Sequence, residues 1–180
     1  MSTQQIIKLG LTLMVVGIIS ASVLSVTHGV TAPIIEEQRI QSIKEAMLEF
    51  FPQAEEVEIE EREDREFYYA YTEGAEIGVA TSVAGTGYGG DIDMMVAMGM
   101  EGEIQGVSIL SHAETPGIGD VIEEEDFKEN FQGITLEDTI AEEIDVITGS
   151  TASVTGAKEG VRNGRDVLAD YLDMEAPAVE

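Results

Sequence analysis

An α+β fold with one membrane-spanning helix is predicted by three features of this 180-residue sequence. A long apolar run without charge comes first, short segments of strand character follow, and a helical segment with one apolar face ends the chain. Apolar periodicity of these kinds distinguishes helices from strands. We therefore expect a single N-terminal transmembrane helix, followed by one domain in which helices cover a mostly antiparallel sheet.

The composition is strongly acidic and lacks cysteine. Nine Lys and Arg against 36 Asp and Glu give a formal net charge of −27 at pH 7. A surface without a basic patch cannot neutralise phosphates, which argues against nucleic acid as a partner. Without cysteine, disulfides and thiolate-held iron–sulfur clusters are excluded, so a redox role requires an organic cofactor. The acidic runs match no calcium-loop spacing, and we interpret them as solvated surface rather than a metal site.

The apolar run is the predicted transmembrane helix. Residues 9–35 contain no Asp, Glu, Lys or Arg, and residues 6–26 form the apolar core. At about 1.5 Å per residue this core spans roughly 32 Å, enough for a bilayer core of about 30 Å. The alternative, a cleaved signal peptide, normally has a shorter apolar region. Lys8 precedes the span, so the positive-inside rule predicts a cytoplasmic N-terminus and an extracytoplasmic domain at the cell membrane.

A second helix is expected between the membrane and the domain. Thr31-Ala32-Pro33 is a favourable helix start, because proline is tolerated in the first turn. Apolar residues then recur at helical spacing until Pro52 ends the run. We therefore divide the chain into a cytoplasmic stub with the transmembrane helix, a connecting helix, the domain and a tail, at residues 1–30, 31–52, 53–174 and 175–180.

The domain is predicted to contain five strands, at residues 57–61, 66–72, 77–83, 92–98 and 104–110. Apolar residues alternate in the first two, as expected for a sheet with one covered face. A short acidic helix is predicted at residues 121–132, and a closing helix at residues 153–172. Gly160 and Gly164 each weaken the closing helix by about 1 kcal/mol relative to alanine, so its formation depends on close packing.

The first candidate site is the segment Asp145-Val146-Ile147-Thr148-Gly149-Ser150-Thr151, just before the closing helix. Residues 144–147 have strand character and lead into a glycine turn rich in hydroxyl groups. Where a strand, a glycine turn and a helix start meet, free backbone N–H groups and the positive end of the helix dipole favour an anion such as phosphate. The alternative is an ordinary helix start, at which the hydroxyls only cap backbone N–H groups.

The second candidate site is the loop His112-Ala113-Glu114-Thr115-Pro116-Gly117-Ile118-Gly119-Asp120. Pro116-Gly117 is a turn signal, and glycines allow the backbone to approach a flat ring closely. We expect Glu114, Thr115 and the loop amides to hydrogen-bond the polar edge of such a ring. The alternative is a plain connection in which His112 is solvated or hydrogen-bonded and has no catalytic role.

Together these segments resemble the FMN-binding domain family of RnfG and NqrC subunits. The first is similar to the family signature Asp-x-x-(Ser/Thr)-Gly-Ala-Thr, and Glu-Thr-Pro-Gly-x-Gly in the second is similar to its other hallmark. In that family a transferase joins FMN through its phosphate to the last threonine of the signature. The resemblance therefore implies covalent FMN on Thr151. It also implies cofactor contacts by Asp145, Thr148, Gly149, Ser150, Glu114, Thr115, Gly117 and Gly119.

The signature of this chain departs from the family at two positions. Ser150 stands where alanine is usual, and Thr155 stands where a basic residue is common. The first departure permits a shifted register with Ser153 as the acceptor, but that register places Ile147 where the aspartate belongs. Thr151 is therefore the preferred acceptor.

The resemblance extends over the whole chain and favours an RnfG-type subunit. It implies an electron carrier of the Rnf complex, a membrane-bound ferredoxin:NAD oxidoreductase coupled to Na⁺ or H⁺ transport, with no turnover of its own. The implied partners are the other membrane and peripheral subunits, a flavin transferase during maturation, and the lipid bilayer through residues 6–26. The alternative from another class is a membrane-anchored acidic module that binds a partner and carries no flavin.

Overall fold

The structure is a computed structural model that describes residues 3–62, 65–136, 138, 140 and 150–172. The chain consists of two compact units, residues 1–43 and residues 44–180, and each unit is described by itself. The predicted strand at 144–147 and the predicted tail at 175–180 lie outside the described residues.

Helix α1 (Thr3–Phe50) carries the apolar run. From Ile7 onward it contains a window with a mean hydropathy of 2.3 in which no residue is buried. Leu13 and Leu24 are 73% and 72% exposed. By length and composition this helix can cross a membrane, where a helix satisfies every backbone hydrogen bond internally.

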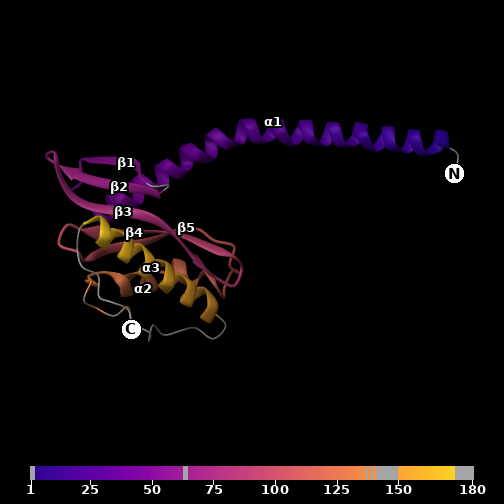
Figure 1. Ribbon diagram of the computed structural model, residues 1–180. Helices are drawn as coiled ribbons and strands as arrows, with labels where there is room; N and C mark the ends of the chain where they lie inside the picture. Colours follow the sequence, from indigo (N-terminus) through magenta and orange to yellow (C-terminus); the bar gives the residue numbers. More distant parts are fainter. Residues whose placement is uncertain (1–2, 63–64, 137, 139, 141–149, 173–180) are drawn as a thin grey trace. The chain divides into compact units, whose positions relative to one another are not determined.

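The expected break between a transmembrane helix and a separate connecting helix is absent. Helix α1 continues through Pro33 (Figure 1). Proline has no N–H, so the hydrogen bond to the carbonyl of Gly29 is lost, but the helical turns on both sides keep theirs. The prediction of a new helix at residue 31 was wrong because a proline that suits a first turn does not require one.

The second unit is built on a five-stranded sheet in which each strand pairs antiparallel with the next (Figure 1). Its strands are β1 (Glu56–Arg62), β2 (Arg65–Thr72), β3 (Ala75–Thr86), β4 (Asp91–Gly99) and β5 (Ile104–Ser111). All five predicted strands are present, and helices cover the sheet. The α+β prediction is thereby confirmed.

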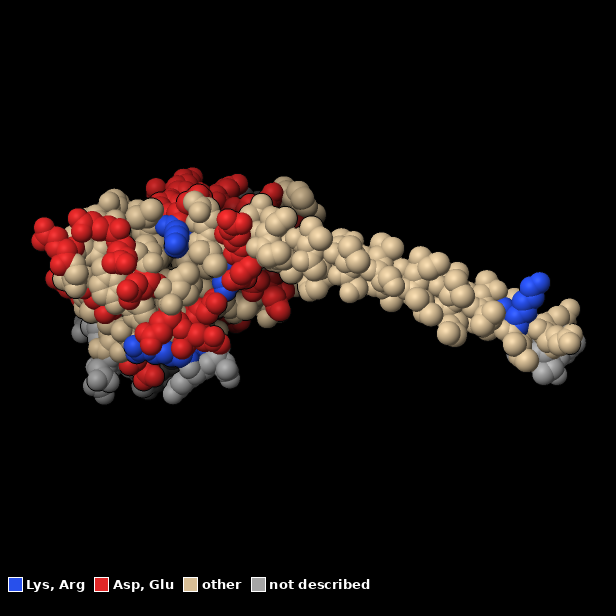
Figure 2. Space-filling model, turned by 90° about the horizontal axis from the view of Figure 1, so that it is seen from above, with Lys and Arg blue, Asp and Glu red and all other residues tan. Residues whose placement is uncertain are grey.

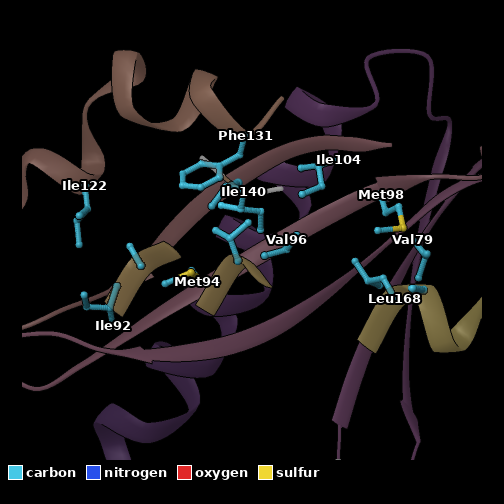
Figure 3. Packing of buried hydrophobic residues seen from close by; sticks show 14 of the residues in the cluster. Val79, Ile92, Met94, Val96, Met98, Ile104, Ile122, Phe131, Ile140 and Leu168 are labelled. Atoms are coloured by element: carbon cyan, nitrogen blue, oxygen red, sulfur yellow. The ribbon is translucent and has the colours of Figure 1, made fainter. Parts of the chain in front are cut away.

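The two faces of the sheet bury different residues, because side chains alternate along each strand. In β2, Phe67 and Tyr69 belong to the main core, whereas the buried Tyr68 and Ala70 face the other way. The main core lies between the sheet and helix α3 (Thr151–Tyr171). Figure 3 labels ten of its residues: Val79, Ile92, Met94, Val96, Met98, Ile104, Ile122, Phe131, Ile140 and Leu168.

The end of α1 and the residue after it cover the opposite face. A Cβ at Gly78 would lie 2.2 Å from ring atoms of Phe51, and a Cβ at Gly106 would lie 2.3 Å from the ring of Phe50. Met47, one helical turn earlier in the same unit, is fully buried. These contacts explain why the apolar residues before Pro52 recur at helical spacing.

Helix α3 lies close to β3 because glycines meet at their contact. A Cβ at Gly85 would lie 2.0 Å from the carbonyl oxygen of Gly156, and a Cβ at Gly156 would lie 2.2 Å from that of Thr86. Farther along the helix, Gly160 and Gly164 contact side chains of β4 in the same way. The helix therefore depends on close packing, as predicted.

Between β5 and α3, three short helical turns replace the predicted acidic helix: η1 (Asp120–Glu123), α2 (Glu125–Lys128) and η2 (Glu129–Phe131). Glu124 has φ −65° and ψ 142°, which interrupts the helix. Phe127 is five positions after Ile122, which corresponds to a rotation of about 140° between the two side chains on a regular helix. With the interruption, both side chains are buried in the same core.

The surface of the second unit is acidic. Figure 2 shows Asp and Glu side chains over much of the visible face of this unit, and neither acidic nor basic side chains along the apolar length of α1. The acidic residues at positions 55–61 and 123–126, which form the acidic runs of the sequence, are exposed. They are solvated, as the sequence predicts.

Candidate functional site

The second candidate segment and the start of α3 meet at one end of the sheet. Strand β3 ends at Thr86, β4 begins at Asp91 and β5 ends at Ser111. Antiparallel pairing therefore brings the loop at residues 87–90 and the loop at residues 112–119 to the same end. The first turns of α3 reach this end through the glycine contact with β3.

Glu114 joins these three segments. Its Oε1 accepts a hydrogen bond of 2.9 Å from the N–H of Gly89, in the loop between β3 and β4. Its Oε2 accepts a hydrogen bond of 2.5 Å from the hydroxyl of Ser153, in the first turn of α3. Glu114 is only 7% exposed, and Ser153 is 1% exposed. The carboxylate is thus a buried connection between residues that are distant in the sequence.

Two glycines make room for this carboxylate. A Cβ at Gly87 would lie 2.1 Å from Oε1 of Glu114, and a Cβ at Gly119 would lie 2.5 Å from Oε2. The Gly119 Cβ would also lie 2.9 Å from the hydroxyl oxygen of Ser153. Any other residue at these positions would have to displace the carboxylate or the loop.

The environment of the Glu114 side chain suits a buried acidic group. Burying a carboxylate is costly unless its oxygens are hydrogen-bonded, and both oxygens here have protein partners. Ser153 is the third residue of α3, so the carboxylate also lies near the positive end of the helix dipole. Hydrogen bonds and the dipole together offset the loss of water.

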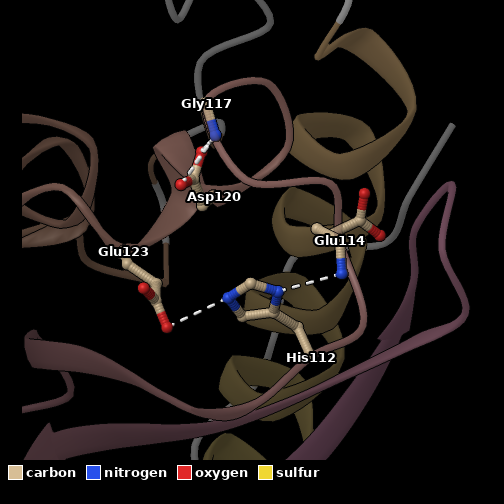
Figure 4. Close-up of polar contacts among 5 residues, drawn as sticks. All are labelled: His112, Glu114, Gly117, Asp120 and Glu123. Carbon is tan, nitrogen blue, oxygen red and sulfur yellow. Dashed lines mark hydrogen bonds and ion pairs between the residues drawn. The ribbon is translucent and has the colours of Figure 1, made fainter.

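The loop after Glu114 is closed by Asp120 (Figure 4). Gly117 has φ +77°, a conformation that favours glycine, and follows Pro116 as in a type II turn. The N–H of Gly117 donates to both carboxylate oxygens of Asp120, at 2.8 and 2.9 Å. The turn predicted at Pro116-Gly117 is present and is held by a side chain three residues ahead.

Other backbone amides of this loop also donate hydrogen bonds to acceptors within the loop. The carbonyl oxygen of Thr115 accepts hydrogen bonds from the N–H groups of Ile118 and Gly119, at 3.1 and 2.9 Å. With Gly117 bound to Asp120, three loop amides that we expected to face a ring already have partners. After Glu114, the exposed residues of the loop are Thr115, Pro116, Gly117 and Ile118.

His112 connects the end of β5 to η1 (Figure 4). Its Nδ1 accepts a hydrogen bond of 3.1 Å from the N–H of Glu114, and its Nε2 lies 3.0 Å from Oε1 of Glu123. Because Nδ1 is the acceptor, the ring proton is on Nε2, from which it is donated to Glu123. His112 is therefore hydrogen-bonded on both sides and orients the chain that leads to Glu114.

The hydroxyls at the start of α3 differ in accessibility. Thr151 is the first helical residue and is exposed, whereas Ser150 and Ser153 are buried. The first intrahelical bond runs from the N–H of Val154 to the carbonyl of Ser150 at 2.9 Å, so the preceding amides are outside the helical pattern. The Ser150 side chain makes no capping hydrogen bond to these amides. Thr151 is thus an exposed residue at a helix start where the N-cap side chain makes no capping hydrogen bond among the described residues.

The remaining predicted site residues, Asp145, Thr148 and Gly149, lie outside the described residues. Sequence reasoning considered Ser153 only as an alternative acceptor and missed it as the partner of Glu114. The two residues are 39 positions apart, and no local pattern connects them. Sequence reasoning considered Tyr88 only as part of the family-like segment Gly87-Tyr88-Gly89-Gly90 and assigned it no contact; in the structure it is 82% exposed in the loop that Glu114 holds.

Comparison with known proteins identifies matching families over most of the chain. The FMN-binding domain family matches residues 87–166, and the RnfG N-terminal region matches residues 1–49. The G subunit of the Na(+)-translocating ferredoxin:NAD(+) oxidoreductase complex of Acetobacterium woodii is 30% identical over 184 residues, covering 87% of this chain and 88% of that protein. The G subunit of the proton-translocating ferredoxin:NAD(+) oxidoreductase complex of Clostridium ljungdahlii is 23% identical, with coverages of 85% and 86%.

Among solved structures, NqrC of Shewanella oneidensis is similar in fold. The TM-score is 0.51 at 19% sequence identity, over 68% of this chain and 73% of that chain. The matched FMN-binding region contains the Glu114 loop, the glycines of α3 and Thr151. The similarity to the Acetobacterium woodii protein, at 30% identity over 87% of this chain, shows that the chain belongs to the RnfG family, the G subunits of ion-translocating oxidoreductase complexes.

Proposed function

We propose that this chain is the electron-carrier subunit of a membrane-bound ferredoxin:NAD oxidoreductase complex coupled to Na⁺ or H⁺ transport, and that Thr151 holds FMN covalently. The observation that carries the proposal is that the hydroxyl-bearing Thr151 is exposed at the first position of α3, in the region that the FMN-binding domain family matches. The chain has no turnover of its own; it holds and positions a redox group for its neighbours in the complex.

The start of α3 fits the phosphate of FMN. Amides that precede the helical hydrogen-bond pattern and the positive end of the helix dipole attract a phosphate. On attachment, the Thr151 hydroxyl oxygen bonds to the phosphorus of a flavin nucleotide and loses its proton to solvent. The donor is an activated flavin dinucleotide, whose second nucleotide departs with its own phosphate, and a flavin transferase is the partner that performs this step.

The neighbouring loops fit a flat ring. Pro116-Gly117 carries no long side chain, and Thr115 beside it is exposed with its hydroxyl. Tyr88 supplies an exposed aromatic side chain on the other loop. Gly119 acts beneath the surface, where it leaves room for Glu114. We assign Thr115 and Gly117 to contact with the ring, and Asp145, Thr148, Gly149 and Ser150 to the frame that presents the acceptor.

The cofactor supplies the electron chemistry when bound, and the protein supplies position. Helix α1 anchors the chain to the lipid bilayer through residues 6–26, and Lys8 favours a cytoplasmic N-terminus with the domain outside the membrane. A covalent bond prevents loss of the cofactor by dilution on that side. The other membrane and peripheral subunits of the complex are the donors and acceptors of its electrons.

The test is to produce the full chain together with a flavin transferase. We expect the denatured protein to remain fluorescent in a gel and to carry one added FMN mass, located on Thr151 by peptide mass spectrometry. Thr151→Ala is expected to abolish the adduct. Thr155→Ala, which changes another exposed hydroxyl of α3, is the matched control and retains it.

Two results would contradict the proposal. An unmodified wild-type chain would favour the alternative, an acidic membrane-anchored module without flavin. An adduct that persists in Thr151→Ala would show that another hydroxyl is the acceptor, and peptide mapping identifies whether it is Ser153.

A further inference from the structure

We infer that Glu114 is a positioning residue, whose buried carboxylate holds the loop at residues 87–90, the loop at residues 112–119 and the start of α3 in one arrangement around the flavin. This inference rests on the proposed function of Thr151. It differs from the expectation that Glu114 itself hydrogen-bonds the ring, and it gives Ser153 a defined part in the same arrangement.

The geometry leaves the Glu114 side chain little access to a ligand. Its two oxygens accept hydrogen bonds from Gly89 and Ser153, and the residue is 7% exposed. The space on its flanks is taken up by Gly87 and Gly119, which approach so closely that neither tolerates a Cβ. A ring at the surface would therefore be contacted by the residues that surround Glu114, not by Glu114 itself.

Each hydrogen bond of Glu114 fixes one part of the proposed site. The bond to Gly89 holds the loop that carries the exposed Tyr88, and the bond to Ser153 holds the first turn of α3. The backbone of Glu114 is held in turn by Nδ1 of His112. Displacing the Glu114 carboxylate would remove the connection between the loop that carries Tyr88 and the start of α3.

The same contact separates the two hydroxyls of the helix start. Residues two positions apart on an α-helix point about 200° away from each other, so a hydroxyl that binds Glu114 turns the other one outward. Ser153 is buried against Glu114, while Thr151 is exposed. The Glu114 carboxylate thus binds the hydroxyl of Ser153, the alternative acceptor, and leaves Thr151, the preferred acceptor, exposed.

The experiment compares the full chain, produced with a flavin transferase, with Glu114→Ala, Glu114→Gln and Ser153→Ala. Glu124→Gln is the matched control, because Glu124 is an exposed carboxylate of the same connection. The readouts are the fraction of chain carrying FMN by intact mass, the fluorescence anisotropy of the attached flavin, and its reduction potential. Circular dichroism reports whether each variant is folded.

We expect Glu114→Ala to reduce the modified fraction at least tenfold and to lower the anisotropy of any attached flavin. Ser153→Ala removes a single hydrogen bond and should reduce the fraction severalfold while the chain stays folded. In Glu114→Gln the amide oxygen still accepts from Gly89 and the NH₂ donates to the Ser153 oxygen, so attachment should be retained. Its flavin should have a higher reduction potential, because a nearby carboxylate opposes the addition of electrons. Glu124→Gln should match the wild type in every readout.

The inference is overturned if Ser153→Ala and Glu114→Ala both carry flavin at the wild-type level with unchanged anisotropy and potential. It is also overturned if Glu114→Gln loses the adduct while remaining folded. Failure of the proposed function has a different signature, an unmodified wild-type chain, so the two outcomes are distinguishable.

Discussion

Helix α3 is held in different ways at its two ends. At its start, the backbone of Gly156 meets the backbone of β3 at Gly85 and Thr86, with no room for a Cβ on either side. At its end, large side chains make the contact: Leu168 is fully buried, and Tyr171 packs against aromatic rings of β2. Backbone contact permits little adjustment, whereas side chains can repack. The start of α3 is therefore suited to fix a site, and its end to stabilise the fold.

The polar groups at the two ends differ as well. Near the start, the buried carboxylate of Glu114 accepts a hydrogen bond from Ser153. At the end, the guanidinium of Arg62 lies 5.9 Å from the ring centre of Tyr69 and 5.5 Å from that of Tyr171. Burial raises the pKa of Tyr69, with a further contribution from Tyr171, so the phenol stays neutral in this apolar setting.

The largest loss of stability is expected at the end of the helix, in Leu168→Ala. Removing this fully buried side chain should lower the free energy of unfolding by about 3 kcal/mol through lost burial and a cavity. Urea unfolding of the detergent-solubilised chain, followed by circular dichroism, measures it. Flavin attachment in the folded fraction should stay at the wild-type level. A loss of attachment comparable to that of Thr151→Ala would contradict the division between the two ends.

A smaller loss of stability with a larger loss of attachment is expected at the start, in Gly156→Ala. The new Cβ would lie 2.2 Å from the carbonyl oxygen of Thr86. Forcing the backbones apart should cost about 2 kcal/mol. Because the shift moves Thr151, the modified fraction should fall below that of Leu168→Ala, by intact mass. Thr155→Ala, on the exposed side of the same turn, is the control and should change neither quantity.

Tyr171→Leu tests the contacts of the Tyr171 ring, which include the guanidinium of Arg62 as well as two aromatic rings. The ring of Tyr171 lies 5.4 Å from that of Phe67 and 5.7 Å from that of Tyr69. Leucine retains much of the apolar area but loses these contacts, so we expect the free energy of unfolding to fall by about 1 kcal/mol. Attachment of flavin should not change. An unchanged unfolding curve would mean that apolar burial accounts for the whole contact.

The smallest effect is a pH-dependent one at Glu76, which lies at the start of β3. Burial raises the pKa of Glu76 above its ordinary value of 4.5, and Oε1 has no hydrogen-bond partner among the described residues. Because the pKa of Glu76 is higher in the folded state than in the unfolded state, its protonated form contributes to stability at acid pH. This contribution is lost as the pH rises through the folded-state pKa. Glu76→Gln should therefore be slightly more stable than the wild type at pH 7, and the gain should vanish below pH 4.5. Unfolding curves at the two pH values check the sign; a gain that grows on acidification would refute it.

The elements that were predicted well have signals contained in a few neighbouring residues. Alternation in β1 and β2 and the glycine turns between strands need no information from elsewhere in the chain. The two wrong predictions of secondary structure concern whether a helix continues or is interrupted. Pro33 is compatible with either a helix start or a helix interior, and the acidic segment after Asp120 has helical composition but must bury Ile122 and Phe127 together. Neighbouring residues do not decide such cases, because the deciding contacts lie in other elements.

Local chemistry thus established the apolar helix, the strands, the glycine turns and the hydroxyl-rich segment before α3, since hydropathy, turn preference and hydroxyl content act over a few residues. Long-range packing established the rest. It brought Glu114 to Ser153 across 39 positions, buried one hydroxyl and left Thr151 outside. Which of two similar side chains faces the solvent depends on the rotation of α3 against the sheet, and close backbone contacts at Gly85 and Gly156 set that rotation.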